Sequence, residues 1–233
     1  MPAPPRLLPA ETEPSPFVSP YLALGLIAGG AAWGLVADRI AARWPAHEDG
    51  SRRPLGWRTA VTVAVGAAAL WALTPFTDRP LEVAFLGLYV LALIVLLATD
   101  LDQRLLPDVL TLPMIPYALL GAALAVSPYV SFRSGFVLDV AAAIGLPLLL
   151  FALSIPFGRG AIGMGDLKLL VSVGFLAGAE RAVIGLIAGA ILSAVVILVL
   201  IAARRITLRS YVPYGPFLII GVLWALLGPV GAS

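Results

Sequence analysis

Long runs of apolar residues, separated by short polar or proline-containing breaks, dominate this chain. Runs of near twenty apolar residues are long enough for an α-helix to cross the hydrocarbon core of a bilayer, which is about 30 Å thick. The pattern predicts an all-α integral membrane protein, a polytopic helical bundle. We expect about eight transmembrane helices, at Tyr21–Ala42, Trp57–Pro75, Leu81–Thr99, Val109–Val126, Phe136–Phe157, Leu167–Ala179, Ala182–Ala203 and Val212–Val230.

Two segments depart from this apolar pattern. Met1–Val18 is rich in proline and acidic residues and has no basic segment leading into a short apolar core, so it is predicted to be a disordered tail rather than a signal peptide. Pro45–Arg53 is a polar stretch between the first two predicted helices. No internal repeat is apparent, and we expect residues 19–233 to form one membrane domain with a short loop at residues 45–56.

The basic residues predict which way the helices cross the membrane. If the tail lies outside and successive helices alternate, eleven basic residues fall on one side and four on the other, and the richer side is expected to be cytoplasmic. The first group is Arg39, Arg43, Arg52, Arg53, Arg58, Arg104, Arg159, Lys168, Arg204, Arg205 and Arg209; the second is Arg6, Arg79, Arg133 and Arg181.

Composition agrees with this class and excludes several kinds of chemistry. Hydrophobic residues make up 61% of the 233 residues and charged residues only 12%, and the mean hydropathy is +1.01. The net charge of +2 is explained by loop charges that set orientation, so nucleic acid binding is not expected. The chain has no cysteine and one histidine, His47, which excludes disulfides and cysteine-ligated zinc, and we expect no metal or other cofactor.

Two short acidic motifs stand at the ends of apolar runs. Thr99–Asp108 contains Asp100 at the end of the third predicted helix, and Gly163–Lys168 contains Asp166 at the start of the sixth. A charge deep in hydrocarbon costs about 2.5–3.5 kcal/mol on insertion scales, so such carboxylates call for a functional explanation. The predicted topology puts both on the cytoplasmic side, where they could meet although sixty-six positions separate them in sequence.

A pair of carboxylates at opposite kinds of helix end can act as an acid and a base. The start of a helix stabilises an anion and its end opposes one, so we expect Asp166 to hold the charge and Asp100 the proton. An ionised aspartate can then take a proton from water while the protonated one hydrogen-bonds a peptide carbonyl. This pattern predicts peptide hydrolysis without a covalent nucleophile, which suits a chain without cysteine.

The neighbouring motif residues have supporting or structural interpretations. Gly163 and Gly165 have no Cβ, which would let the backbone turn sharply and a substrate strand approach. Lys168 is expected to bias the local field toward the Asp166 anion. Asp108, which follows Pro107, is predicted to cap a helix rather than to catalyse. Asp102 is either a support for the pair or a solvated side chain. Taken singly, Asp100 could be an interfacial charge and Asp166 a residue that starts a helix.

Together these motifs resemble those of the type IV prepilin peptidases. Asp100-Leu101-Asp102, which runs into Leu106-Pro107-Asp108, is followed by Gly163-Met164-Gly165-Asp166-Leu167-Lys168, and Val212-Pro213-Tyr214-Gly215-Pro216-Phe217 is similar to the motif that opens the family's final helix. The resemblance extends from about Tyr21 to the C-terminus. The glycine-x-glycine-aspartate motif alone is shared with other intramembrane aspartyl proteases.

The resemblance implies an aspartic endopeptidase of the bacterial inner membrane. Such an enzyme removes a short basic leader from type IV prepilin or pseudopilin precursors on the cytoplasmic side, with the precursor's apolar helix in the lipid bilayer, and Asp100 and Asp166 match its catalytic pair. Many members also carry a cytoplasmic loop with two cysteine pairs, associated with methylating the new N-terminus. Here the corresponding region is short and lacks cysteine, so the resemblance implies a form without methyltransferase activity.

Two other functions fit part of the pattern. A small proton- or cation-coupled transporter also uses membrane carboxylates, but its site usually lies near mid-membrane between repeats. A presenilin-like protease that cuts within membrane helices would be expected to hold its first aspartate well inside a helix. Here Gln103 and Arg104 follow Asp100 closely, which favours cleavage beside the membrane.

Overall fold

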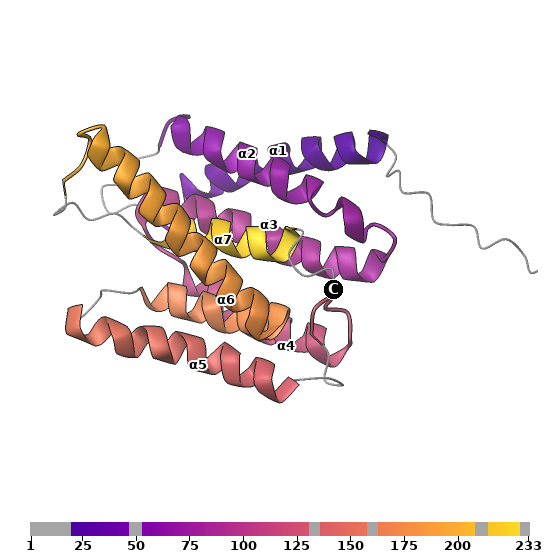
Figure 1. The fold of residues 1–233 in the computed structure, drawn as a ribbon. Helices are drawn as coiled ribbons and strands as arrows, with labels where there is room; N and C mark the ends of the chain where they lie inside the picture. The colour runs from indigo at the N-terminus through magenta and orange to yellow at the C-terminus, as the bar shows by residue number, and fades with distance from the viewer. Residues whose placement is uncertain (1–19, 47–52, 131–135, 158–162, 208–213, 229–233) are drawn as a thin grey trace, which may run out of the picture.

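The structure is a computed structural model that describes residues 20–46, 53–130, 136–157, 163–207 and 214–228. The predicted tail, His47 and the start of the final motif, Val212 and Pro213, lie outside these residues. Within them the chain is helical throughout (Figure 1), with two short 3₁₀ turns, η1 (Thr74–Phe76) and η2 (Ile155–Phe157), and seven α-helices: α1 (Pro20–Ala41), α2 (Trp57–Trp71), α3 (Pro80–Gln103), α4 (Asp108–Ala123), α5 (Phe136–Ser154), α6 (Met164–Ala202) and α7 (Gly215–Leu227).

The helices confirm a helical membrane protein but not a bundle of eight spans. In the described residues, five helical segments are long and apolar enough to cross a bilayer: Pro20–Ala41, Trp57–Phe76, Pro80–Gln103, Val137–Ser154 and Met164–Ala202. The helices α4 and α7 are apolar but shorter, with 16 and 13 residues. The predicted fourth and eighth spans are therefore helices that fall below the usual spanning length.

The predicted sixth and seventh spans both lie within α6. The helix is broken at Gly178, where φ is 77° and ψ is 177°, a conformation that L side chains rarely adopt. The Asp139 carboxylate of α5 accepts a hydrogen bond from the Ala179 backbone N–H at 3.1 Å, directly after the break. Figure 1 shows the two limbs of α6 diverging from this point. Hydropathy alone places the boundary only approximately, because both limbs are apolar.

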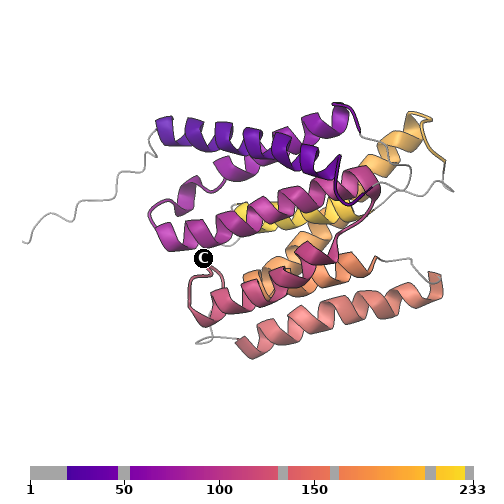
Figure 2. The same ribbon diagram turned by 180° about the vertical axis from the view of Figure 1, so that it is seen from behind.

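Successive helices run in alternating directions, so the connections gather at two ends of the bundle (Figures 1 and 2). One end, here called the Asp100 end, holds the ends of α1, α3 and α5 and the starts of α2, α4, α6 and α7. Among the described basic residues, the following stand in or beside the helix termini that meet at the Asp100 end: Arg39, Arg43, Arg53, Arg58, Arg104, Lys168, Arg204 and Arg205. Arg79, just before α3, and Arg181, just after the break in α6, stand toward the opposite end.

Among the five span-length helices, α3 is the most buried, and it packs against α1, α2, α4 and α7. Its apolar side chains from Leu86 to Ala98 form much of the core, including the fully buried Leu93 and Leu96. One polar contact crosses this core, between the Tyr89 hydroxyl and Ser172 Oγ of α6 at 2.7 Å. Because α3 is held on several sides, its last turn is presented at a defined position at the Asp100 end.

Helices α1 and α2 approach each other more closely than side chains would allow. A Cβ on Gly30 would overlap the backbone of Gly66, and a Cβ on Gly34 would overlap the backbone of Thr62. Contact between small residues is how membrane helices bring their backbones together. The α1–α2 pair is therefore packed backbone against backbone.

Candidate active site

The first carboxylate of the candidate site stands in the last turn of α3. Asp100 is 5% exposed, and its backbone carbonyl accepts a hydrogen bond from the Arg104 N–H at 2.9 Å. Arg104 ends the helix in the left-handed region, with φ of 57°. The following Leu106 and Pro107 are buried, and the chain turns directly into α4. This short connection keeps the end of α3 and the start of α4 beside the start of α6.

The second carboxylate opens α6. Gly163 is the N-cap residue, which makes Asp166 the third residue of the helix, and the Asp166 carboxylate accepts a hydrogen bond from the Gly163 backbone N–H. Gly165 packs against Leu106 so closely that a Cβ there would lie 2.6 Å from the Leu106 Cβ. The glycine at position 165 therefore lets the start of α6 dock on the α3–α4 connection, with Asp166 half-buried beside it.

The start of α7 completes the site. Gly215 lies against the Asp100 carboxylate, where a Cβ would overlap Oδ2 and lie 2.8 Å from Cγ. The preceding Tyr214 is close enough to Asp166 for the carboxylate to act on it: burial, together with the Asp166 charge, raises the pKa of Tyr214 to about 12. The phenol therefore stays protonated near neutral pH, and it donates a hydrogen bond to the Leu186 carbonyl at 3.1 Å.

The two carboxylates are near enough for their charges to interact, and they differ in surroundings. The charges of Asp166 and Arg104 both act on Asp100. Within the described residues, no group hydrogen-bonds the buried Oδ2 of Asp100, whereas Asp166 is half-exposed and bonded to Gly163. Buried polar atoms normally have a hydrogen-bond partner. An unpaired carboxyl oxygen beside a second carboxylate can bind a water molecule or a peptide carbonyl.

Asp102 lies on the opposite side of α3 and is not solvated. Its side chain is 6% exposed, and its Oδ1 pairs with Arg58 Nη1 at 2.6 Å and with Arg53 Nε at 3.1 Å. The two residues after Asp100 turn the helix by about 200°, so Asp102 faces α1 and α2 rather than Asp166. Of the two interpretations of Asp102 from sequence, the solvated one is wrong.

The predicted cap at Asp108 is also wrong. Pro107 is the N-cap residue of α4, and its carbonyl accepts hydrogen bonds from the backbone N–H of Thr111 at 3.0 Å and from Thr111 Oγ1 at 3.3 Å. Asp108 stands in the first turn, and its Oδ1 pairs with Lys168 Nζ at 2.6 Å. The lysine expected to act on Asp166 thus forms an ion pair with Asp108, because α4 and α6 begin side by side.

Sequence reasoning did not assign Tyr214 and Gly215 to the site. The available signal was the Tyr214-Gly215-Pro216 sequence, in which a glycine followed by proline opens a helix. Hydropathy and motif spacing do not say what that glycine contacts. In the part of the chain that the structure describes, no group of three or more His, Cys, Asp or Glu side chains could hold a metal ion.

Comparison with known proteins shows which family the chain resembles. Residues 87–202, which include both carboxylates, match the type IV leader peptidase family. A protein of Burkholderia pseudomallei named prepilin leader peptidase/N-methyltransferase is 34% identical over 174 residues, covering 73% of this chain and 54% of the relative. Proteins of the same name from Aeromonas hydrophila and Dichelobacter nodosus are 33% identical over 135 residues and 32% over 143.

These last matches cover 58% and 60% of this chain and 46% and 47% of the relatives, so the chain spans about half the length of the curated relatives it matches. No solved structure matches the chain. The family match and these relatives place this chain in the type IV leader peptidase family.

Proposed function

We propose that this protein is a membrane aspartic endopeptidase that removes the basic leader from type IV prepilin-like precursors, with Asp100 and Asp166 as its catalytic pair. The observation that carries the proposal is the meeting of these two carboxylates with the start of α7 at one end of the bundle. The name of the relatives, prepilin leader peptidase/N-methyltransferase, supports the same reaction and substrate class.

In the proposed reaction the two carboxylates have different roles. Asp166, half-exposed at the positive end of α6 and bonded to Gly163, takes a proton from water as the water oxygen attacks the peptide carbonyl. Asp100, buried and with an unpaired Oδ2, carries a proton and donates a hydrogen bond to the carbonyl oxygen of the tetrahedral intermediate. When the intermediate collapses, the C–N bond breaks and the leaving amine receives a proton from the pair.

The proposed orientation puts the catalytic pair at the cytoplasmic face of the bacterial inner membrane. Eight of the described basic residues lie at or near the Asp100 end and two toward the other, and positive charge favours the cytoplasm. A precursor would then approach with its apolar helix in the bilayer and its leader in the cytosol. Cysteine accessibility labelling in intact cells tests this orientation: thiols introduced after Arg204 should be shielded from an impermeant reagent.

We propose that the enzyme lacks the methyltransferase activity named in its relatives. The stretch between α1 and α2 is short, and the chain contains no cysteine. The proposal predicts that mature product made by the purified protein carries an unmodified N-terminal amine, even with S-adenosylmethionine present. A methylated product in that reaction, identified by mass spectrometry, would contradict it.

Leader cleavage by the purified protein in liposomes tests the proposed activity. Wild type should release the leader from a prepilin-like precursor, and Asp100→Asn and Asp166→Asn should not. Asp78→Asn is the matched control, because Asp78 is an exposed carboxylate near the opposite end of the bundle. Cleavage by wild type and by the control, with both site variants inactive but correctly inserted, is the expected result. Near-normal turnover by either site variant would rule out the assigned pair.

A further inference from the structure

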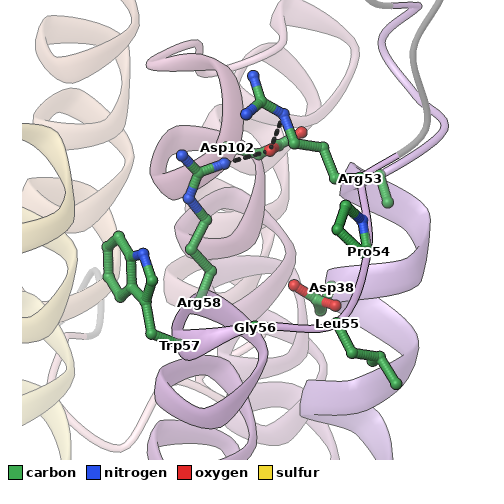
Figure 3. A pocket seen from close by; sticks show the side chains of 9 residues that line it. Asp38, Arg53, Pro54, Leu55, Gly56, Trp57, Arg58 and Asp102 are labelled. Atoms are coloured by element: carbon green, nitrogen blue, oxygen red, sulfur yellow. Dashed lines mark hydrogen bonds and ion pairs between the residues drawn. The ribbon is translucent and has the colours of Figure 1, made fainter.

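The side of α3 opposite the carboxylate pair is tied to the connection between α1 and α2. Figure 3 shows the guanidinium groups of Arg53 and Arg58 converging on the carboxylate of Asp102. Arg53 stands in the connection and Arg58 is the second residue of α2, so one carboxylate joins two segments to the last turn of α3. These residues line a pocket of about 190 Å³ together with Asp38 and Trp57.

Further contacts hold this corner in place. Gln103, the last residue of α3, donates a hydrogen bond from Nε2 to the Pro45 carbonyl at 2.7 Å. On the α2 side, Thr59 Oγ1 donates to Asp38 of α1 at 2.9 Å and accepts from the Gly56 N–H at 3.2 Å. The residues that grip Asp102 are therefore themselves anchored on the α1–α2 pair.

The end of α3 needs such support. The last carbonyls of a helix lack intrahelical partners, and α3 has no basic residue in its own last turn to offset the negative end of its dipole. Arg104, which follows at once, adopts a left-handed conformation that non-glycine residues rarely take. Two guanidinium groups brought from outside the helix add positive charge to that of Arg104, and their ion pairs with one buried carboxylate restrict how the last turn can move.

We propose that Arg53 and Arg58 are positioning residues that act through Asp102 to hold the last turn of α3, and with it Asp100, in register with Asp166. The inference rests on the proposed peptidase function. The guanidinium groups pair with Asp102, whose side chain is turned by about 200° around the helix from that of Asp100. They act on the geometry of Asp100 relative to Asp166. Loss of their ion pairs with Asp102 would displace Asp100 without changing its chemical group.

Steady-state cleavage by Asp102→Asn, Arg58→Gln and the double variant tests the proposal. Misplacing a catalytic group by about 1 Å can cost 100-fold, so Asp102→Asn should lower kcat by about 10- to 100-fold with KM unchanged. Because Asp102 and Arg58 form one ion pair, kcat of the double variant should be no lower than that of Asp102→Asn alone. Glu82→Gln, which breaks the Arg79–Glu82 pair at the other end of α3, is the matched control and should keep wild-type kcat.

Losses that multiply in the double variant would overturn the proposal, because the residues would then act independently. A lowered melting temperature with wild-type kcat for folded enzyme would also overturn it, because the grip would then serve stability only.

Hydrogen exchange gives a readout that does not depend on activity. In Asp102→Asn the backbone amides of Gln103 and Arg104 should exchange faster than in wild type, whereas in Glu82→Gln they should not. If the exchange rates of these amides were unchanged in Asp102→Asn, the proposal that Asp102 holds the end of α3 would be wrong, even if cleavage fell. If wild type cleaved no precursor, the proposed function would fail, and the exchange experiment would still decide whether Asp102 holds the helix end.

Discussion

Asp100 and Asp102 are two carboxylates two positions apart on one helix, yet their surroundings are opposite. Asp102 is held by two arginines, and Asp100 is buried with an oxygen that no described group hydrogen-bonds. The difference follows from helix geometry, because a separation of two residues turns the side chains to nearly opposite faces. One face of α3 meets α1 and α2, and the other meets the start of α7, where Gly215 lies against Asp100.

Under the proposed function, Asp102 is a structural carboxylate and Asp100 a reacting one. Leaving a buried polar atom without a partner costs about 1–3 kcal/mol, so a chain selected only for stability would pair or replace Asp100. The pairing of Asp102 shows that arginines were available at the same end of the same helix. The unpaired oxygen supports the proposal that Asp100 takes part in the reaction.

The largest effect is expected when either Asp100 or Asp166 loses its carboxylate. Asp100→Asn or Asp166→Asn should lower kcat by about 10²- to 10⁴-fold, the usual contribution of general acid–base catalysis. The loss should exceed that of Asp102→Asn, which leaves both reacting groups in place. Leader cleavage by the three variants, normalised to folded protein, measures the order. An equal loss for Asp102→Asn would mean that the two faces of α3 do not differ in function.

A smaller effect is expected at the glycine that touches Asp100. Gly215→Ala adds a methyl group that overlaps the Asp100 carboxylate, so the carboxylate or the start of α7 must shift. We expect kcat to fall by about 10- to 100-fold, as for other small displacements of a catalytic group. Gly145→Ala is the control, since its Cβ meets nothing within 4 Å. Equal activity of the two variants would show that Asp100 is not confined by α7.

At the opposite end of the bundle, a substitution should change stability without changing the reaction. Gly178→Ala puts a side chain at a φ of 77° and 2.8 Å from Asp139 Oδ1. Strained backbone of this kind costs about 1–3 kcal/mol, and we expect that loss in the free energy of unfolding in detergent. The kcat of the folded protein should stay within about threefold of the wild-type value. A loss comparable to that of Asp100→Asn would link the kink to catalysis.

The smallest effect is expected at the third carboxylate of the motif. Asp108→Ala breaks the ion pair with Lys168. The Asp108 side chain is largely exposed and does not cap α4. Exposed ion pairs contribute about 0–1 kcal/mol, so unfolding should be easier by less than about 1 kcal/mol. Thermal melting and leader cleavage measure both quantities. Complete loss of turnover by a fully folded Asp108→Ala protein would place Asp108 with the catalytic pair instead.

Much of the fold could be predicted because long apolar runs leave few alternatives to helices. The starts and ends of α1 and α3 fall within a few residues of the predicted ones. The break in α6 was harder to interpret, because the chain on both sides of Gly178 is apolar and the kink depends on the Asp139 side chain of another helix. The count of spans depends on such tertiary contacts.

The candidate site likewise has residues that the sequence identifies and residues that only tertiary contacts reveal. Motif residues identify Asp100 and Asp166, because carboxylates at the ends of apolar runs are unusual. The pattern could not show that Asp102 forms ion pairs with two arginines more than forty positions away. Nor could it show that Asp108 pairs with Lys168 instead of capping its own helix. Likewise, nothing in the spacing indicates that Gly215 touches Asp100. Such pairings depend on which helix faces meet, which is set by packing between distant segments.

The backbone contact between α1 and α2 has a consequence for motion. Gly30 and Gly66 fit together without intervening side chains, so sliding one helix along the other would cause a collision at one point and a void at another. The two helices therefore move as a unit, and α3 is attached to them through Asp102 and Gln103. The first limb of α6 ends instead at a single glycine joint. If the proposed pair changes its spacing during a reaction, the first limb of α6 would have to move with the α3–α4 connection, because its start docks on Leu106 and pairs with Asp108.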